Sequence, residues 1–320
     1  PQAGGACRAG NIYNLLQRVL YRMAEQGQTE YAQIPVISLN LMGEEKHTGF
    51  RITPGLLSGG IAAGCYGDLI MCLYQQVKPY EQNPGETDRI RSQVEKKLCE
   101  SIRRHRNGRH TREKNYRYAC EVFSKVPVKP GKKKRVGITG EIYMKYSKLG
   151  NDDIESFLLR QGMEPYSGGF VNYCLYLVDT ERYKAEKYQH NPIMAKACAF
   201  VLHRLCEAQK HLLTVIGETD RFQTDLPFPE LKEKVQGILA EGCNTGDGWL
   251  IAAEVIQYVE KGCGSVLILH PFGCLVSHVC ERGILQRLHA RFPDVSIQTI
   301  EYDYDQSKTL RESRILLAIS

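Results

Sequence analysis

The sequence contains no pair of cysteines spaced C-x-x-C, although twelve cysteines lie among its 320 residues. Zinc ribbons and thioredoxin-like redox sites depend on such local pairs, so their absence disfavours both classes of protein. Twelve cysteines are also too few for a disulfide scaffold in a chain of this size. Isolated cysteines of this kind are core residues, metal ligands or nucleophiles.

Long apolar runs and targeting signals are missing as well. No run approaches the ~20 residues that a membrane helix needs, and residues 1–6 lack the basic and then apolar pattern of a signal peptide. We therefore expect a soluble, cytoplasmic protein without a membrane partner. The chain starts with Pro1 rather than Met, close to an informative motif, so we also expect it to be a piece of a longer protein.

Positive charge is concentrated in one stretch. Residues Lys96 to Arg117 carry nine Lys or Arg against two Glu, a balance of +7 that accounts for the net charge of +6 of the whole chain. One interpretation is a surface for phosphates or for an acidic partner; the other, which we favour, is a solvated helix face. Nucleic acid is disfavoured as a partner, because no interleaved aromatic residues and no recognisable binding motif accompany the charge.

Apolar patterns of helical and strand type alternate along the chain, which is typical of a doubly wound α/β fold with a parallel sheet. The Pro-, Gly- and Lys-rich stretch "VPVKPGKKKR" predicts a linker and divides the chain into domains 1–134 and 135–320. Residues 171–225 are predicted to be a helical insertion in the second domain. The expected strands are 34–40, 135–140, 265–270 and 295–303, and the main expected helices are 12–23, 59–77, 96–117, 151–161, 249–260, 275–291 and 309–318.

Three of the cysteines share one local environment. Cys243 precedes the turn Asn-Thr-Gly-Asp-Gly, whose Asn244 and Asp247 are candidate N-caps for the following helix. Cys274 follows an expected strand through Pro-Phe-Gly, and Cys7 lies in a glycine-containing loop before a helix. The positive end of a helix dipole biases a thiol toward thiolate, and α/β folds bind ligands at the carboxyl ends of their strands.

Spacing alone leaves three interpretations of this trio open. Thiolates from separate loops are suited to an iron–sulfur cluster with three protein ligands. They are equally suited to a zinc ion with three cysteines and one water. The third interpretation is that the three cysteines are structural. Cys280, by contrast, falls inside an apolar helical pattern, where a free cysteine is usually a small buried residue.

Several motifs in order resemble a known family. They are "GACRAGNIYNLL", "GITGEIYMKYSKLGNDDIESFLLRQGMEP", "GCNTGDGWLIAAEVI", "HPFGCLVSHV" and "IEYDYDQSKTLRESRILLA". Together they resemble the 2-hydroxyacyl-CoA dehydratase D-component family, above all its form in the long fused proteins called CoA-substrate-specific enzyme activases. One departure is that this chain has "GACRAGNIY" where the family has "GPCRFGQY". The chain retains Cys7, Arg8 and Gly10 but lacks the proline.

The resemblance implies two Rossmann-like parallel-sheet domains and a [4Fe-4S] cluster on Cys7, Cys243 and Cys274, either single or bridged to a second cluster as in double-cubane proteins. It implies an ATP-dependent activase as the electron donor, a CoA thioester as the substrate, and a dimer or a homologous partner subunit. The expected function is thus an iron–sulfur redox subunit with dehydratase-like chemistry. The alternatives are a non-catalytic electron-relay or assembly module and, more distantly, a structural zinc protein.

Other polar residues of these motifs have both a functional and a structural interpretation. Glu141 is either a partner or proton carrier near the cluster, or a cap at a strand end. His278, one turn after Cys274, is either a proton donor or a structural hydrogen bonder, as is His270. Asn244 and Gly246 set the turn that orients Cys243. Arg8 is expected to hold a phosphate or carboxylate, or to form an ion pair.

Overall fold

The computed structural model describes residues 11–36 and 53–320, and the chain divides into the units Pro1–Ile52 and Thr53–Ser320. The first unit contains α1 (Asn11–Glu25) and η2 (Thr29–Gln33). α1 is amphipathic, as its spacing predicts, with Leu15 and Val19 exposed. The predicted strand 34–40 lies mostly outside the described residues, as do Cys7 and Arg8.

Residues 53–320 contain one four-stranded parallel sheet with the strand order β2-β1-β3-β4. The central strands are mainly apolar and are buried except at one end residue each, as expected for a sheet covered on both faces. The sheet confirms the mixed α/β class with a parallel sheet. Its strands are β1 (Arg135–Gly140), β2 (Glu164–Tyr166), β3 (Ser265–Pro271) and β4 (Ser296–Tyr302).

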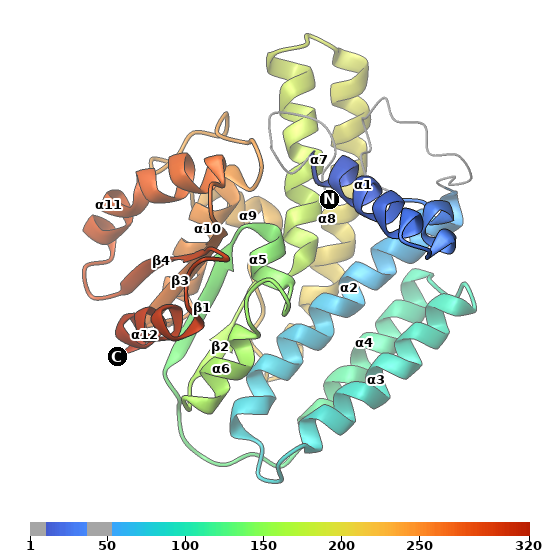
Figure 1. The fold of residues 1–320 in the computed structure, drawn as a ribbon. Coiled ribbons are helices and arrows are strands. Elements are labelled where there is room, and N and C mark those ends of the chain that lie inside the picture. Colours follow the sequence, from blue (N-terminus) through green and yellow to red (C-terminus); the bar gives the residue numbers. More distant parts are fainter. Residues whose placement is uncertain (1–10, 37–52) are drawn as a thin grey trace. The chain divides into compact units, whose positions relative to one another are not determined.

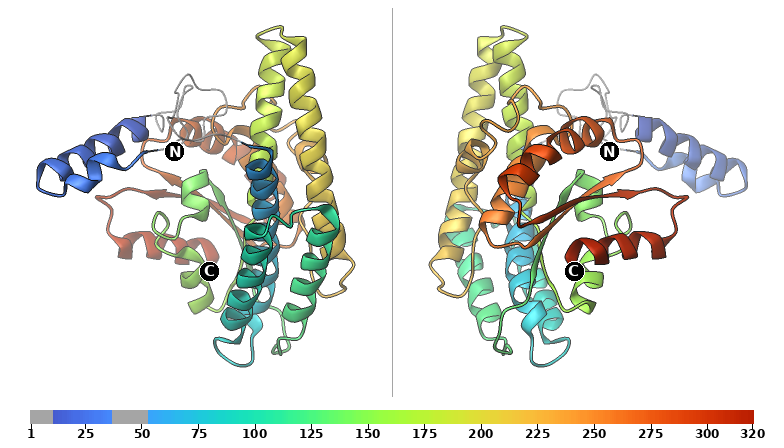
Figure 2. Two further views of the ribbon diagram at one scale, coloured as in Figure 1. Left: turned by 90° about the vertical axis from the view of Figure 1, so that its right-hand side faces the viewer. Right: turned by 90° about the vertical axis from the view of Figure 1, so that its left-hand side faces the viewer.

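Helices cover both faces of the sheet (Figures 1 and 2). Alternate side chains of β3 enter the two cores on these faces. Leu267 and Leu269 pack on one face, under α5 (Ile142–Tyr146), α6 (Ile154–Arg160) and α12 (Lys308–Ile319). Val266 and Ile268 pack on the other face, in a core shared with α10 (Gly248–Glu260) and α11 (Arg282–Arg291). The sheet therefore forms the middle layer of three, and its carboxyl edge is left for loops.

A large helical part shares this second core. Within the described residues 53–134 there is no strand, so a second Rossmann-like domain is not confirmed. The basic stretch expected as one helix over 96–117 forms parts of two helices, because residues 104–108 turn the chain. The elements of the helical part are α2 (Pro54–Val77), η3 (Lys78–Tyr80), α3 (Glu86–Arg103), α4 (Arg109–Ser124), α7 (Phe170–Lys187), α8 (Pro192–Gly217) and α9 (Phe228–Glu233).

The segment Gly55–Tyr80, which includes most of α2, is the one described segment that is long and apolar enough to cross a membrane by length and composition alone. This corrects the expectation that no apolar stretch reaches that length. The helix packs one side into the protein core, where Cys65, Leu69 and Leu73 are fully buried. A core helix of a folded domain passes the same test of length and composition, so the segment is weak evidence for a membrane span.

Candidate functional site

Three segments meet at the carboxyl edge of the sheet. The turn 243–248 packs directly against the segment after Cys274, because a Cβ on Gly246 would lie only 2.9 Å from a methyl carbon of Val276. Gly246 has a φ of +59°, as its predicted role in the turn requires. The segment after β1 joins them, since Glu141 donates its N–H to the carbonyl of Leu269 over 2.8 Å. The loops of Cys243 and Cys274 are thus neighbours.

The backbone of Cys243, rather than a side chain, caps α10. Its carbonyl accepts the N–H of Trp249 over 2.9 Å, which closes the turn. Asp247 occupies the N-cap position without making a side-chain cap, contrary to the prediction. Its carboxylate lies instead near the backbone N–H of Ile142 in α5, which lowers the Asp247 pKa slightly against the effect of burial. The turn is therefore tied to the segment after β1 as well as to its own helix.

The segment after Cys274 contains a π-helical turn, η4 (Ser277–Glu281), inside the helix expected over 275–291. Such turns are rare and are frequent at functional sites. Burial raises the pKa of the Cys274 thiol, while hydrogen bonds from Ser277 offset part of this effect. The predicted bias toward thiolate is therefore not borne out at Cys274, because desolvation by burial raises its pKa.

Cys280 is a residue that the sequence pattern assigned to the core. It is only partly buried, and it lies near enough to Cys243 and Cys274 to interact electrostatically with both. Burial, followed by these two thiols and Glu281, raises the pKa of Cys280 to about 11. A third described cysteine thus accompanies the predicted pair.

Three carboxyl groups gather beside these loops. Glu281 is 1% exposed, and burial raises its pKa to about 8, with Ser277 offsetting part of the effect. Burial also raises the pKa of Asp247 well above its ordinary value and that of Glu141 to a smaller extent. Glu141 and Glu281 both contribute to the raised pKa of Asp247, and Glu141 to that of Glu281, since like charges disfavour ionisation. Sequence reasoning missed Glu281, which has no motif of its own.

Buried polar atoms without a hydrogen-bond partner of normal geometry are concentrated on the same segments. They include Asn244 Nδ2, Ser277 Oγ, both carboxylate oxygens of Glu281, both ring nitrogens of His270 and the hydroxyl of Tyr176. Tyr176 of α7 faces the turn, because its hydroxyl would lie 2.5 Å from a Cβ on Gly248. Buried polar groups are nearly always paired in folded proteins. Such a concentration is typical of a site that receives another group.

His270, in β3, and His278, in the segment after Cys274, lie next to each other. The rings of His270 and His278 are 5.5 Å apart and nearly perpendicular, and both face Glu301 of β4. Burial lowers the pKa of His270, which is fully enclosed. His278 Nδ1 lies 2.7 Å from the carbonyl oxygen of Cys274, and Arg282 completes the group with a 2.6 Å contact to Glu301. The structure places His278 one turn from Cys274, as predicted.

The structural interpretation of Glu141 is borne out in its geometry. Its carboxylate accepts the N–H groups of Tyr143 and Met144 at 3.1 and 3.0 Å, which caps the first turn of α5. Cys7 and Arg8 lie outside the described residues. Within residues 11–36 and 53–320, no three His, Cys, Asp or Glu side chains converge closely enough to hold a metal ion. The described part of the chain thus supplies two of the three predicted ligands.

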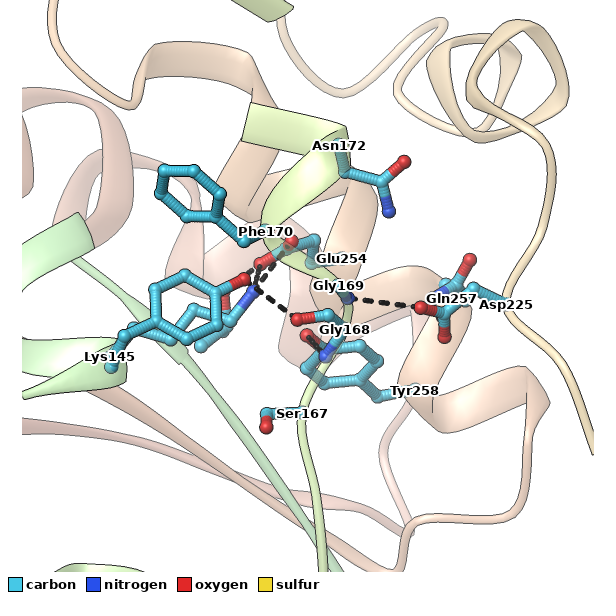
Figure 3. A network of polar contacts seen from close by, with 12 residues as sticks. Lys145, Ser167, Gly168, Gly169, Phe170, Asn172, Asp225, Glu254, Gln257 and Tyr258 are labelled. Carbon is cyan, nitrogen blue, oxygen red and sulfur yellow. Dashed lines mark hydrogen bonds and ion pairs between the residues drawn. The ribbon is translucent and has the colours of Figure 1, made fainter. Parts of the chain in front are cut away.

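A buried polar network lies beside this site and holds the start of α7 (Figure 3). Lys145 of α5 pairs with Glu254 of α10 at 2.7 and 2.9 Å, and both side chains are 3% exposed. The backbone of Gly168 donates to Tyr258 and accepts from Tyr146. This network joins the segments after β1 and β2 to α10, so it positions the helix that follows the Cys243 turn.

Asp68 of α2 caps the start of α7 in the same region. Its two carboxylate oxygens accept the N–H groups of Phe170 and Val171 at 2.7 and 2.9 Å. Burial nevertheless raises the pKa of Asp68 to about 7. The folded state therefore binds a proton on the Asp68 carboxylate more tightly than the unfolded state does. The part of the unfolding free energy that comes from this tighter binding is lost as the pH rises from about 4 to 7.

We expect Asp68→Asn to remove this pH dependence. Between pH 5 and pH 8 the unfolding free energy of the unsubstituted protein should fall relative to that of the variant by about 2–3 kcal/mol, because the amide stays neutral. Urea denaturation at a series of pH values measures the difference. An identical pH profile for the two proteins would contradict the assignment.

Comparison with known proteins adds no identification. No family model matches the chain, and neither a curated protein nor a solved structure is similar enough to count as a match. The proposal below therefore depends on the residues of the site and on the motifs of the sequence.

Proposed function

We propose that the chain is an iron–sulfur redox subunit, similar to the 2-hydroxyacyl-CoA dehydratase D-component, that receives a low-potential electron from an ATP-dependent activase. The observation that carries the proposal is the meeting of the Cys243 and Cys274 loops at the carboxyl edge of a parallel sheet, among buried polar atoms that lack a hydrogen-bond partner of normal geometry. Two Rossmann-like domains and a cytoplasmic location are parts of the same proposal.

The residues at the edge are suited to such a cluster. Iron–sulfur clusters are bound by cysteine thiolates. Cys243 and Cys274 would be two of the ligands, and Cys7 would be the third. A bound cluster would supply one-electron transfer at low potential. The raised pKa of Cys274 means that this thiol loses its proton when a metal binds, so assembly is expected to be favoured by higher pH.

The chain's own residues orient and shield the ligands. The Cys243 carbonyl and Gly246 set the turn, and Val276 packs against it, so that little freedom remains between the two loops. His278 donates its Nδ1–H to the carbonyl oxygen of Cys274, and its Nε2 lies 3.6 Å from Glu301, so the ring connects that loop to β4. Substrate binding as a CoA thioester follows from the resemblance.

Anaerobic reconstitution with iron and sulfide tests the proposal. We expect a brown protein with broad visible absorption, and at least a tenfold loss of bound iron in Cys243→Ala and Cys274→Ala, since a three-ligand cluster does not survive the loss of one thiolate. Cys99→Ala is the matched control, because Cys99 is exposed on α3 and distant in the fold from the sheet edge.

Two results would contradict the proposal. One is an unsubstituted protein that binds zinc but assembles no cluster; the other is a cluster that persists in both Cys→Ala variants. A dehydration assay with a panel of 2-hydroxyacyl-CoA thioesters, in the presence of an activating ATPase, then separates a catalytic subunit from a relay module. Turnover supports the first, and a reducible cluster without turnover supports the second.

A further inference from the structure

Tyr176 of α7 brings a polar atom to the Cys243 turn from a distant part of the chain. Its side chain is fully buried, yet its hydroxyl has no hydrogen-bond partner of normal geometry. The hydroxyl and the carbonyl oxygen of Cys243 would lie 2.5 and 2.2 Å from a Cβ on Gly248, so the two oxygens are neighbours. A buried hydroxyl without a partner therefore lies directly beside the backbone of a predicted ligand.

Aromatic packing holds this hydroxyl in place. The Tyr176 ring meets the ring of Trp249 edge-on, with a centroid distance of 5.1 Å and an interplanar angle of 70°. Trp249 packs in turn on Phe228 of α9 at 5.9 Å. Because Trp249 lies in the first turn of α10, the packing that fixes the start of this helix also fixes the Tyr176 ring.

Two further donors accompany Tyr176. The side-chain amide nitrogen of Asn244 and the hydroxyl of Ser277 are also buried and lack a partner of normal geometry. The donors come from three segments, namely α7, the turn after Cys243 and the segment after Cys274. An unpaired buried donor destabilises a folded protein, and native proteins contain few of them. Three such donors on the segments of the two thiol loops indicate a bound acceptor.

A negatively charged sulfur is the acceptor that fits these donors. Burial and the charge of Asp247 raise the pKa of the Tyr176 hydroxyl, so this group stays protonated at neutral pH and is available as a donor. The thiolate and sulfide sulfurs of an iron–sulfur cluster accept hydrogen bonds, and such bonds are one of the factors that set the reduction potential of the cluster.

We propose that Tyr176 donates a hydrogen bond to a sulfur of the bound cluster and thereby raises the cluster's reduction potential, with Asn244 and Ser277 as further donors. The inference rests on the proposed function and adds residues that the resemblance does not assign. The reduced cluster carries one more negative charge than the oxidised cluster, so a donor favours the reduced form. Tyr176 forms no bond to iron and is a positioning residue.

Redox titration of the reconstituted full chain, followed by electron paramagnetic resonance of the reduced cluster, tests the inference. Tyr176→Phe removes the hydroxyl and keeps the ring, so we expect an unchanged iron content and a lower midpoint potential. At the midpoint potential of the unsubstituted protein, the ratio of reduced to oxidised cluster should fall by about threefold to tenfold, the equivalent of one hydrogen bond. Ser277→Ala should shift the potential in the same direction.

Tyr116→Phe is the matched control. Tyr116 of α4 is also fully buried, and its hydroxyl too has no partner of normal geometry. Its ring packs beside Tyr66 and His211 in the helical part of the chain. In the cluster-free protein both Tyr→Phe variants should have a higher midpoint of thermal unfolding, because each loses an unpaired buried hydroxyl. Only Tyr176→Phe should change the potential of the cluster.

The outcomes separate this inference from the proposed function. Unchanged potentials in Tyr176→Phe and Ser277→Ala would overturn the inference and leave the iron–sulfur assignment in place. An equal shift in Tyr116→Phe would overturn it too, since the effect would not depend on the position of the hydroxyl. So would a folded Tyr176→Phe that holds no cluster, because a donor to sulfur is not a ligand. An unsubstituted protein that assembles no cluster would overturn both.

Discussion

Replacing Lys145 with Met is expected to lower the free energy of unfolding by about 3–5 kcal/mol, since it leaves the carboxylate of Glu254 buried without its cation. Both side chains of this pair are 3% exposed, and the ammonium group contacts both carboxylate oxygens. The hydroxyl of Thr139 donates to the same carboxylate over 2.5 Å but cannot neutralise it. Urea denaturation at pH 7 measures the loss.

A second substitution separates the buried charge from the lost packing. In Lys145→Met with Glu254→Gln, no charge is left unpaired, so part of the stability should return. The exposed pair Lys125 and Glu121 provides the control, because its side chains are 70% and 62% exposed. Lys125→Met should change the unfolding free energy by less than about 1 kcal/mol. Equal effects of Lys125→Met and Lys145→Met would show that burial of the pair is unimportant.

Gly140→Ala is expected to have the other large effect, with a loss of about 3 kcal/mol or more, or a failure to fold. Gly140 ends β1 with a φ of +133°, a region that only glycine occupies readily. A Cβ there would also overlap the backbone of Leu269 on β3. The two strands would have to separate at the carboxyl edge, where the segments of Glu141 and Cys274 begin. Thermal and urea unfolding measure the loss.

Gly60→Ala is the control for this substitution. Gly60 lies inside α2 and has open space around the position of a Cβ. Alanine favours a helix by about 1 kcal/mol over glycine, so this variant should be as stable as the unsubstituted protein or more stable. If Gly140→Ala were as stable as Gly60→Ala, that result would contradict the close approach of Gly140 in β1 to the backbone of Leu269 in β3.

Much of the α/β pattern is predictable from the sequence because it is local. The expected strands at 135–140, 265–270 and 295–303 correspond to β1, β3 and β4, whose apolar runs are long enough to identify. β2 was missed, since it has three residues and contains Pro165. A proline is tolerated there because β2 is at the edge of the sheet, which only the strand order reveals.

The candidate site was predictable only in part. Glycine-containing turns at helix starts identify Cys243 and Cys274, and the structure places their loops side by side. Cys280 and Glu281 were missed because their surroundings in sequence are those of an ordinary helix. A π-helical turn and the burial of that helix against the Cys243 turn bring them to the site.

The amino-acid sequence by itself determines that parallel strands and helices alternate and that cysteines stand at two loop-to-helix junctions, since periodicity and turn chemistry act over a few residues. The tertiary structure decides which polar groups are left buried without partners and how the thiols titrate. Those properties depend on desolvation by segments that are distant in the chain, such as the segments of Glu141, Asp247 and Glu281. The exposure of Ile193 and Phe200 on α8 belongs to the same class, because only packing shows which half of the helix the core leaves uncovered.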